Sequence, residues 1–204
     1  MNQFTLTLLR HGETVSPKSL NGSTNVDISN KGYQQMLDAC ATLKGIEHIS
    51  SSPLQRCCKV ADFIAKEWNV PFEIHNELSE MNFGDWDGVS IDTLFRKFPQ
   101  QMDQFFNAPW QTKVPNGESV KDFYERVDAV WLTHLNLQKN ALLVCHGGVI
   151  RYLIAKILGM PITGNKHICA LKVDYAAVVQ INITIDDDNI VWPTLIWPTV
   201  STSK

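Results

Sequence analysis

Two histidines, two arginines and one glutamate in this 204-residue chain stand near the ends of predicted strands and helices. Arg10 and His11 end one strand, Arg56 lies in the first turn of a helix, and His146 ends another strand. Arginine offers paired donors to phosphate oxygens. A neutral imidazole among cations can attack phosphorus, because the neighbouring charge disfavours imidazolium. With Glu80 as a proton donor for the leaving oxygen, these residues predict phosphoryl transfer through His11.

An alternation of strand and helix patterns must bring these residues together. Helices are expected to follow a cap at Ser29, to begin at Ser52-Pro53, to run from about Glu118, and to follow His146. Such alternation predicts an α/β domain with a mostly parallel sheet, whose ligands bind beyond the carboxyl ends of the strands. Short apolar runs place the expected strands at residues 5–9, 46–50, 70–75, 141–145 and within 177–185.

The edge of that sheet should favour an anion. The helices after Ser52 and His146 point their N-termini at it, so their free N–H groups and positive dipole ends face the site. Gly147 and Gly148 let backbone N–H groups approach a ligand closely. The chain is expected to form a single domain over residues 1–204, with an irregular substrate-side segment at about 76–117 and an extended C-terminal tail at about 186–204.

Composition excludes several classes of function. A net charge of -3 and a pI of about 6.0 provide no basic surplus for nucleic acid. No apolar run approaches the length of a membrane span, and the first ten residues predict no signal peptide. The odd number of cysteines, five, and the lack of a C-x-x-C pattern predict reduced core thiols in a cytoplasmic protein. A homodimer is compatible with the sequence.

Five ordered segments carry a resemblance to the histidine phosphatase superfamily, which includes the cofactor-dependent phosphoglycerate mutases. They begin with Leu-Arg-His-Gly-Glu-Thr and end with Val-Cys-His-Gly-Gly, and the similarity extends over residues 6 to about 158. The segments are residues 9–14, 51–56, 77–86, 115–119 and 144–148.

The resemblance implies the three-layer α/β/α sandwich of that family and a role for each residue. His11 would be phosphorylated, while Arg10, Arg56 and His146 would hold the phosphoryl oxygens with the backbone N–H of Gly147. Glu80 would donate a proton and later activate water. No metal or organic cofactor is implied.

One position departs from the family pattern. Pro17 stands where many members carry an asparagine that contacts phosphate. Asn21, Gly22 or Ser23 is expected to supply a donor from the same loop instead.

Within the family, residues 77–86 and 115–119 most resemble α-ribazole-5′-phosphate phosphatases of cobalamin biosynthesis. The implied partner is a small phosphorylated substrate, whose apolar part we expect to meet aromatic residues of segment 83–114. A broad-specificity phosphatase, a phosphoglycerate mutase and a non-catalytic phospho-ligand binding protein remain alternatives. The other histidines, His48, His75, His134 and His167, lack a motif and are expected to be structural or exposed.

Overall fold

The structure, a computed structural model, describes residues 1–197 of the chain. Six strands form one mixed sheet in the order β3-β2-β4-β1-β5-β6. The first four of these are mutually parallel, whereas β5 runs antiparallel to both β1 and β6. The strands are β1 (Asn2–Arg10), β2 (His48–Ser51), β3 (Phe72–Ile74), β4 (Ala141–Cys145), β5 (Val178–Ile185) and β6 (Val191–Ile196).

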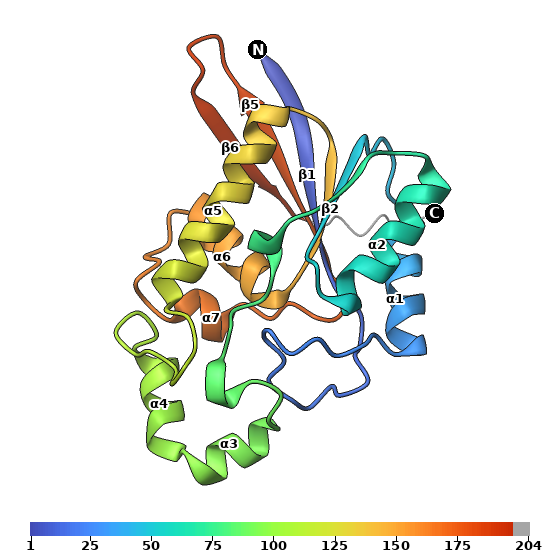
Figure 1. Ribbon diagram of the computed structural model, residues 1–204. Coiled ribbons are helices and arrows are strands. Elements are labelled where there is room, and N and C mark those ends of the chain that lie inside the picture. The colour runs from blue at the N-terminus through green and yellow to red at the C-terminus, as the bar shows by residue number, and fades with distance from the viewer. Residues whose placement is uncertain (198–204) are drawn as a thin grey trace, which may run out of the picture.

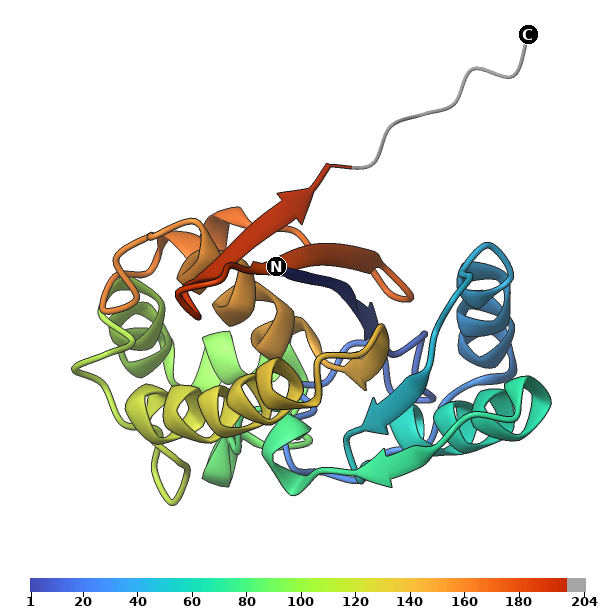
Figure 2. The same ribbon diagram turned by 90° about the horizontal axis from the view of Figure 1, so that it is seen from above.

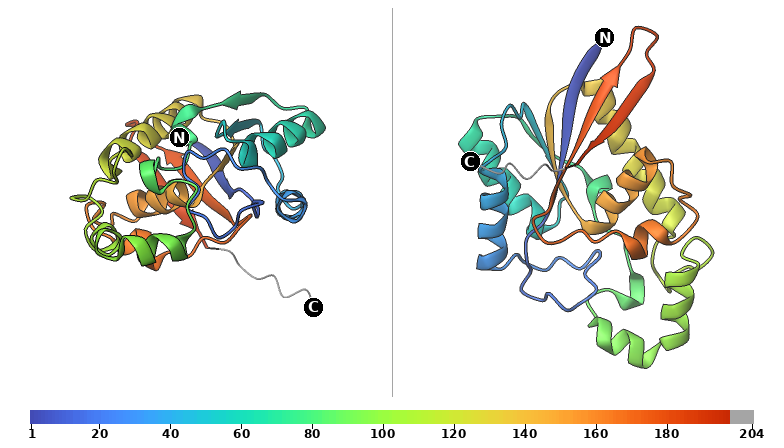
Figure 3. Two further views of the ribbon diagram at one scale, coloured as in Figure 1. Left: turned by 60° about the horizontal axis from the view of Figure 1, so that its bottom comes forward. Right: turned by 180° about the vertical axis from the view of Figure 1, so that it is seen from behind.

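Helices cover both faces of the sheet and extend past its lower edge. Two helices, α1 (Asn30–Cys40) and α2 (Gln55–Trp68), lie on one face. The opposite face carries α5 (Val120–Leu137) and α6 (Gly147–Ile157), so the arrangement has three layers, as the view from above in Figure 2 shows. Three shorter helices are α3 (Ile91–Lys97), α4 (Pro99–Asn107) and α7 (Lys166–Ala170). Figures 1 and 3 show α3 and α4 beyond the carboxyl end of β1. The expected α/β/α sandwich is confirmed.

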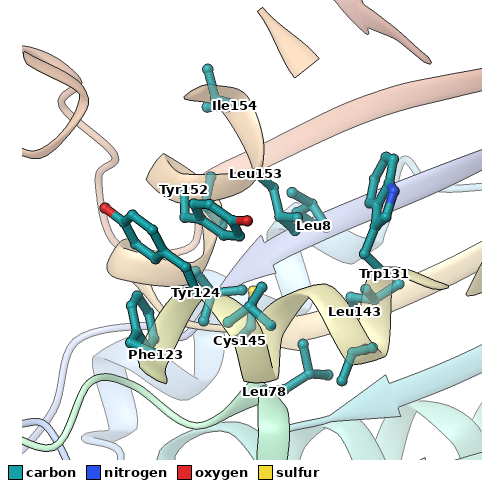
Figure 4. Close-up of a cluster of buried hydrophobic side chains, with 14 of the residues drawn as sticks. Leu8, Leu78, Phe123, Tyr124, Trp131, Leu143, Cys145, Tyr152, Leu153 and Ile154 are labelled. Carbon is teal, nitrogen blue, oxygen red and sulfur yellow. The ribbon is translucent and has the colours of Figure 1, made fainter. Parts of the chain in front are cut away.

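Alternating side chains of the central strands pack into two apolar cores. Leu8 and Leu143 pack toward α5 and α6, together with Trp131 and Leu153 (Figure 4). The neighbouring residues, such as Leu9, pack in the second core with α1 and α2. Every residue of β4 is buried, as expected of a strand covered on both faces. The carboxyl ends of β1, β2 and β4 are therefore held in fixed register beside one another.

Several expected boundaries are corrected by the structure. The helix predicted from Ser52-Pro53 begins at Gln55, and its N-cap residue Leu54 makes no side-chain cap. The strand expected at 46–50 is His48–Ser51, and that expected at 70–75 is only Phe72–Ile74. The cap at Ser29 is confirmed, since its side chain accepts a hydrogen bond from the N–H of Gly32.

The expected C-terminal tail contains a strand. Residues 191–196 form β6, which pairs with β5 across a turn closed by Asp186. The Asp186 carboxylate also accepts a hydrogen bond from the indole N–H of Trp192 in the first Trp-Pro-Thr copy. The second copy begins at Trp197 and otherwise lies outside the described residues, as does the rest of the predicted tail.

Two further properties concern the described part of the chain. Within residues 1–197, no helix combines the length and apolarity needed to cross a membrane. All five cysteines are unbridged. Cys40, Cys57 and Cys145 are buried as expected, but Cys169 is exposed, so it is not a core thiol.

Candidate active site

His11 follows directly after β1 and is fixed as a neutral imidazole. Its backbone N–H donates to the carbonyl of Cys145 on the neighbouring strand at 3.0 Å. Its Nδ1 lies 2.8 Å from the carbonyl oxygen of Gly12. A carbonyl only accepts, so Nδ1 carries the proton and Nε2 keeps its lone pair. Burial chiefly, with help from the charges of Arg56 and Arg10, lowers the pKa of His11 to about 3. The ring therefore offers an unprotonated nucleophile at neutral pH.

Arg10 lies beside His11 and is held by the loop before β5. One terminal nitrogen donates to the carbonyl of Val173 at 2.6 Å, and the guanidinium lies 4.3 Å above the ring of Tyr175. The Nε of Arg10 is buried and has no partner among the described residues. Tyr175 also packs against His11, with ring centroids 5.7 Å apart. No sequence motif marks Tyr175, because only the fold brings its loop to the end of β1.

Arg56 is fully buried, and its guanidinium mainly donates hydrogen bonds to the loop of residues 21–24. Its terminal nitrogens donate to the backbone carbonyls of Asn21, Gly22 and Thr24 at 3.1, 2.7 and 2.8 Å. Its Nε donates to Nδ1 of His146 at 3.4 Å. Four hydrogen bonds thus occupy a guanidinium that carries five N–H groups. The expected pair of free donors to phosphate is not present, since only one N–H remains.

His146 is also fully buried, behind His11. The two imidazole centroids are 5.2 Å apart. Its Nε2 lies 2.8 Å from the hydroxyl of Ser52. Since Nδ1 accepts from Arg56, Nε2 carries the proton and donates to Ser52. Burial, assisted by the charge of Arg56, lowers the pKa of His146 well below its ordinary value. The hydroxyl of Ser52, which was predicted to cap the helix, accepts from the backbone N–H of Leu54 at 3.3 Å and also orients this ring.

Glu80 lies at the N-terminus of α6. Its two carboxylate oxygens accept hydrogen bonds from the backbone N–H groups of Gly148, at 3.0 Å, and Met81, at 3.1 Å. Gly147 occupies the first position of α6, where a helix leaves the backbone N–H without an intrahelical acceptor. The carboxyl group and this amide therefore meet at one helix end.

Arg126 of α5 holds the segment that carries Glu80. It donates to the backbone carbonyls of Glu77, Ser79 and Glu80 at 2.7, 2.7 and 2.9 Å. It also forms a bidentate ion pair with Glu118 at 3.1 and 2.7 Å. No sequence motif marks Arg126, since its backbone partners lie up to 49 positions away in the chain.

The three residues expected to supply an alternative donor for phosphate, Asn21, Gly22 and Ser23, have different hydrogen-bond partners in the structure. The backbone N–H groups of Gly22 and Ser23 donate to the Asp87 carboxylate at 3.1 and 2.7 Å. In the structure these two N–H groups are therefore engaged by Asp87. Asn21 does line the cavity described next, but its amide N–H₂ donates to the carbonyl of Ser16. Pro17 lines the same cavity.

A cavity of about 350 Å³ opens from these residues toward α3, α4 and α7. Arg10, His11, Glu80, Gly147 and Asn21 line it, whereas Arg56 and His146 do not. Its lining also includes apolar side chains, both aliphatic and aromatic, several of which come from segment 83–114. Its aromatic members include Phe83, Trp86, Phe105, Phe106, Phe123 and Tyr124. The cavity therefore joins an anion-binding end to an apolar end.

Three of the remaining histidines form a separate group. The ring of His134 on α5 lies 6.0 Å from the rings of both His48 and His75. In the part of the chain that the structure describes, no group of three or more His, Cys, Asp or Glu residues is arranged to hold a metal ion. His167 lines the cavity and hydrogen-bonds to the hydroxyl of Tyr124.

A buried neutral histidine, arginines and a helix N-terminus at the carboxyl edge of an α/β/α sandwich define a phosphohistidine-type phosphatase or mutase. The sequence pattern of the histidine phosphatase superfamily (branch 1) matches residues 6–194. The chain belongs to this superfamily and is an enzyme of the histidine phosphatase type.

Individual relatives differ in the activity that their names state. "Probable phosphoglycerate mutase GpmB" of Escherichia coli O1:K1 / APEC is 30% identical over 179 residues, which cover 82% of this chain and 83% of the relative. The crystal structure of the alpha-ribazole phosphatase from Shigella flexneri is 27% identical, with a TM-score of 0.77 and 95% of each chain covered. The mycobacterial glucosyl-3-phosphoglycerate phosphatase Rv2419c shares the fold, with a TM-score of 0.81 at 22% identity over 95% of this chain and 97% of the other.

Proposed function

We propose that the protein hydrolyses phosphomonoesters through a covalent phosphohistidine at Nε2 of His11. The observation that carries this proposal is the hydrogen bond from Nδ1–H of His11 to the Gly12 carbonyl, which leaves the Nε2 lone pair free. Nε2 attacks phosphorus, so an N–P bond forms while the P–O bond to the leaving group breaks. Water then attacks the phosphohistidine, which restores neutral His11 and releases orthophosphate.

Glu80 is the proposed proton donor. In its protonated form it gives its proton to the departing oxygen, and as a carboxylate it then takes a proton from the attacking water. Its backbone partners Gly148 and Met81 fix the carboxyl group in place for both steps.

The phosphoryl group is proposed to bind at the N-terminus of α6. The N–H of Gly147 and the unpartnered Nε of Arg10 supply donors on the cavity wall. Arg56 contributes its charge and its one remaining N–H. His146 is proposed to complete the site, because its neutral ring lies directly beside that of His11.

α-Ribazole 5′-phosphate is the proposed substrate, with a role in cobalamin biosynthesis. The aromatic part of the cavity suits a benzimidazole nucleoside better than a small acid. The name of the Shigella flexneri relative supports the same choice. A cytoplasmic location goes with this proposal, and the five unbridged cysteines are compatible with a reducing compartment.

Phosphoglycerate mutase activity is the second candidate, and the similarity to GpmB favours it. A mutase returns the phosphoryl group from His11 to an isomeric substrate rather than to water. A phosphatase of broad specificity would use the same chemistry without selecting the leaving group.

Phosphate release separates these functions. We would compare kcat/KM for α-ribazole 5′-phosphate, 3-phosphoglycerate, a nucleoside 5′-monophosphate and p-nitrophenyl phosphate. A preference of about a hundredfold for the ribazole ester, about 2.7 kcal/mol, supports the assignment. Similar values across the panel indicate a broad phosphatase, and conversion of 3-phosphoglycerate to its isomer indicates a mutase.

The covalent step has its own test. Protein quenched after exposure to a ³²P-labelled ester should carry an acid-labile label, which the His11→Ala variant should lack. Turnover should survive EDTA. Turnover by pure His11→Ala protein, or inhibition by EDTA, would overturn the mechanism.

A further inference from the structure

Arg151 is a third arginine near the phosphoryl site, and no motif in the sequence singles it out. It lies in the second turn of α6 and lines the cavity together with Arg10 and Gly147. Arg56, which the sequence places in the phosphate site, does not line this cavity. On the cavity wall, the second arginine beside Arg10 is therefore Arg151 rather than Arg56.

The guanidinium of Arg151 is anchored at one end and available at the other. Its Nε donates to the carbonyl of Leu171 at 2.8 Å. Among the described residues, no hydrogen bond or ion pair engages its two terminal nitrogens, although the side chain is only partly exposed. An anchored Nε reduces the rotamer freedom that the side chain would lose when it binds an anion.

Three donors converge beside Gly147. A methyl group built on Gly147 would lie 3.1 Å from a terminal nitrogen of Arg151 and 3.6 Å from Nε of Arg10. The N–H of Gly147 belongs to the same residue, and the Arg10 Nε is the buried donor that has no partner. The space that a larger side chain would take is thus bordered by two guanidinium groups and the N-terminus of α6.

The guanidinium groups of Arg10 and Arg151 carry like charges and repel each other, although the carboxylates of Glu80 and Asp174 partly offset the charge of Arg10. Both guanidinium groups remain protonated in a protein. Glu80 lies against the N-terminus of α6, but its oxygens already accept hydrogen bonds from Gly148 and Met81. A phosphoryl oxygen beside Gly147 would accept from both arginines and offset their repulsion.

We propose that Arg151 is a catalytic residue that donates to the transferring phosphoryl group, at the oxygen bound by the N–H of Gly147. This inference rests on the proposed function, and it adds a ligand to the same site. The charge that builds on the phosphoryl oxygens during transfer is then met by Arg10, Arg151 and the helix N-terminus together.

The test uses Arg151→Met, which keeps the length of the side chain and removes its donors. A phosphoryl ligand affects every substrate alike, so kcat/KM should fall by a common factor of about 30 for phenyl phosphate, 3-phosphoglycerate and a nucleoside 5′-monophosphate. That factor corresponds to about 2 kcal/mol. Arg151→Lys should recover part of the loss, because a point charge remains.

Binding of inorganic phosphate gives a readout that needs no turnover. Its dissociation constant, measured by isothermal titration calorimetry, should rise in Arg151→Met by roughly the same factor as kcat/KM falls. Lys156→Met is the matched control, since it removes one positive charge from α6 at a residue that pairs with Asp128 outside the cavity. This control should leave phosphate affinity unchanged.

Two outcomes would overturn the inference while leaving the proposed function intact. Unchanged phosphate affinity in Arg151→Met would remove Arg151 from the phosphoryl site. A loss confined to 3-phosphoglycerate would instead place it against the carboxylate of the leaving group. Failure of the proposed function would be visible separately, as a wild-type protein that binds phosphate but forms no label on His11.

Discussion

The carboxylate of Glu80 rests on the backbone of Gly148, which donates a hydrogen bond to Oε2 at 3.0 Å and leaves no room for a side chain beside Oε1. Glu80 reaches this position from a segment 68 positions earlier in the chain. The helix end that we propose to bind the phosphoryl group therefore also positions the proposed proton donor.

Gly148→Ala is expected to separate these two roles. The new methyl group would overlap Glu80 Oε1, so the carboxyl group must swing away while α6 stays folded. For an alkyl phosphate, kcat should fall by about 100-fold, within the range that general acid catalysis supplies. For p-nitrophenyl phosphate, whose leaving group needs little protonation, the loss should be several times smaller. Equal losses for both esters would contradict the role of Glu80.

Arg126→Met should loosen the segment that ends at Glu80. The change removes three donors to backbone carbonyls and one side of the ion pair with Glu118. We expect the free energy of unfolding to fall by about 2 kcal/mol, with a lower kcat. Urea denaturation and steady-state kinetics provide the measurements. Lys121→Met removes an exposed pairing with Glu125 on the same helix and should change neither quantity measurably. A stable, fully active Arg126→Met protein would show that the segment holds its shape alone.

His11 should stay neutral across the physiological range. Its pKa of about 3 lies below the ordinary value because burial and two arginines oppose the added charge. Histidine NMR spectra recorded from pH 8 to 5 should show no protonation shift for His11, identified by its loss in His11→Ala. A titration midpoint near pH 6.5 would mean that the His11 ring is solvated and that its Nε2 lone pair is not protected from protonation.

The cluster of His48, His75 and His134 should make the fold sensitive to acid. Burial, with the charges of the other two rings, lowers the pKa of His134 to about 4 from an unfolded value near 6.5. The unfolded state therefore binds the proton more readily. The contribution of His134 is complete above about pH 6.5 and is lost as the pH falls toward 4. That contribution amounts to about 3 kcal/mol.

Urea denaturation between pH 8 and 4.5 measures this dependence. Two charged groups also face the cluster, Glu73 from β3 and Lys139 after α5, and they act on His48 in opposite directions. His134→Leu should have a shallower loss of stability with acid than the wild type. Part of the slope should remain, since His11 and His146 are shifted in the same direction. An identical slope in both proteins would assign the acid sensitivity elsewhere.

Local sequence was informative where local physics decides the structure. The apolar run at 141–145 predicts a doubly covered strand, and the Ser29 cap needs only the N–H three residues later. Segments whose residues have distant tertiary partners are harder to predict from the sequence. The Ser52 hydroxyl contacts a histidine 94 positions away. Pro193 argues against a strand at the sequence level, yet it lies in β6, which is an edge strand, where proline is tolerated.

In the candidate active site, too, the sequence predicts some features and tertiary contacts decide the others. The chemical residue types and their order along the chain identify the phosphohistidine machinery. The backbone contacts of Arg56, and the support that Arg126 and Tyr175 give, depend on carbonyls and rings that no motif encodes. Packing alone determines which arginines face the cavity.

Because β1 lies between β4 and β5 in the sheet, it can complete its pairing only late in synthesis on the ribosome. This strand ends at Arg10, next to His11, and is made before the other described strands, yet its two neighbours are β4 and β5, made from residues 141–145 and 178–185. At about 5–20 residues per second, roughly 10 to 35 s pass before both partners exist. The proposed nucleophile is therefore translated early, whereas the strand before it is paired late. Until then, an apolar strand with two unpaired edges is at risk of aggregation.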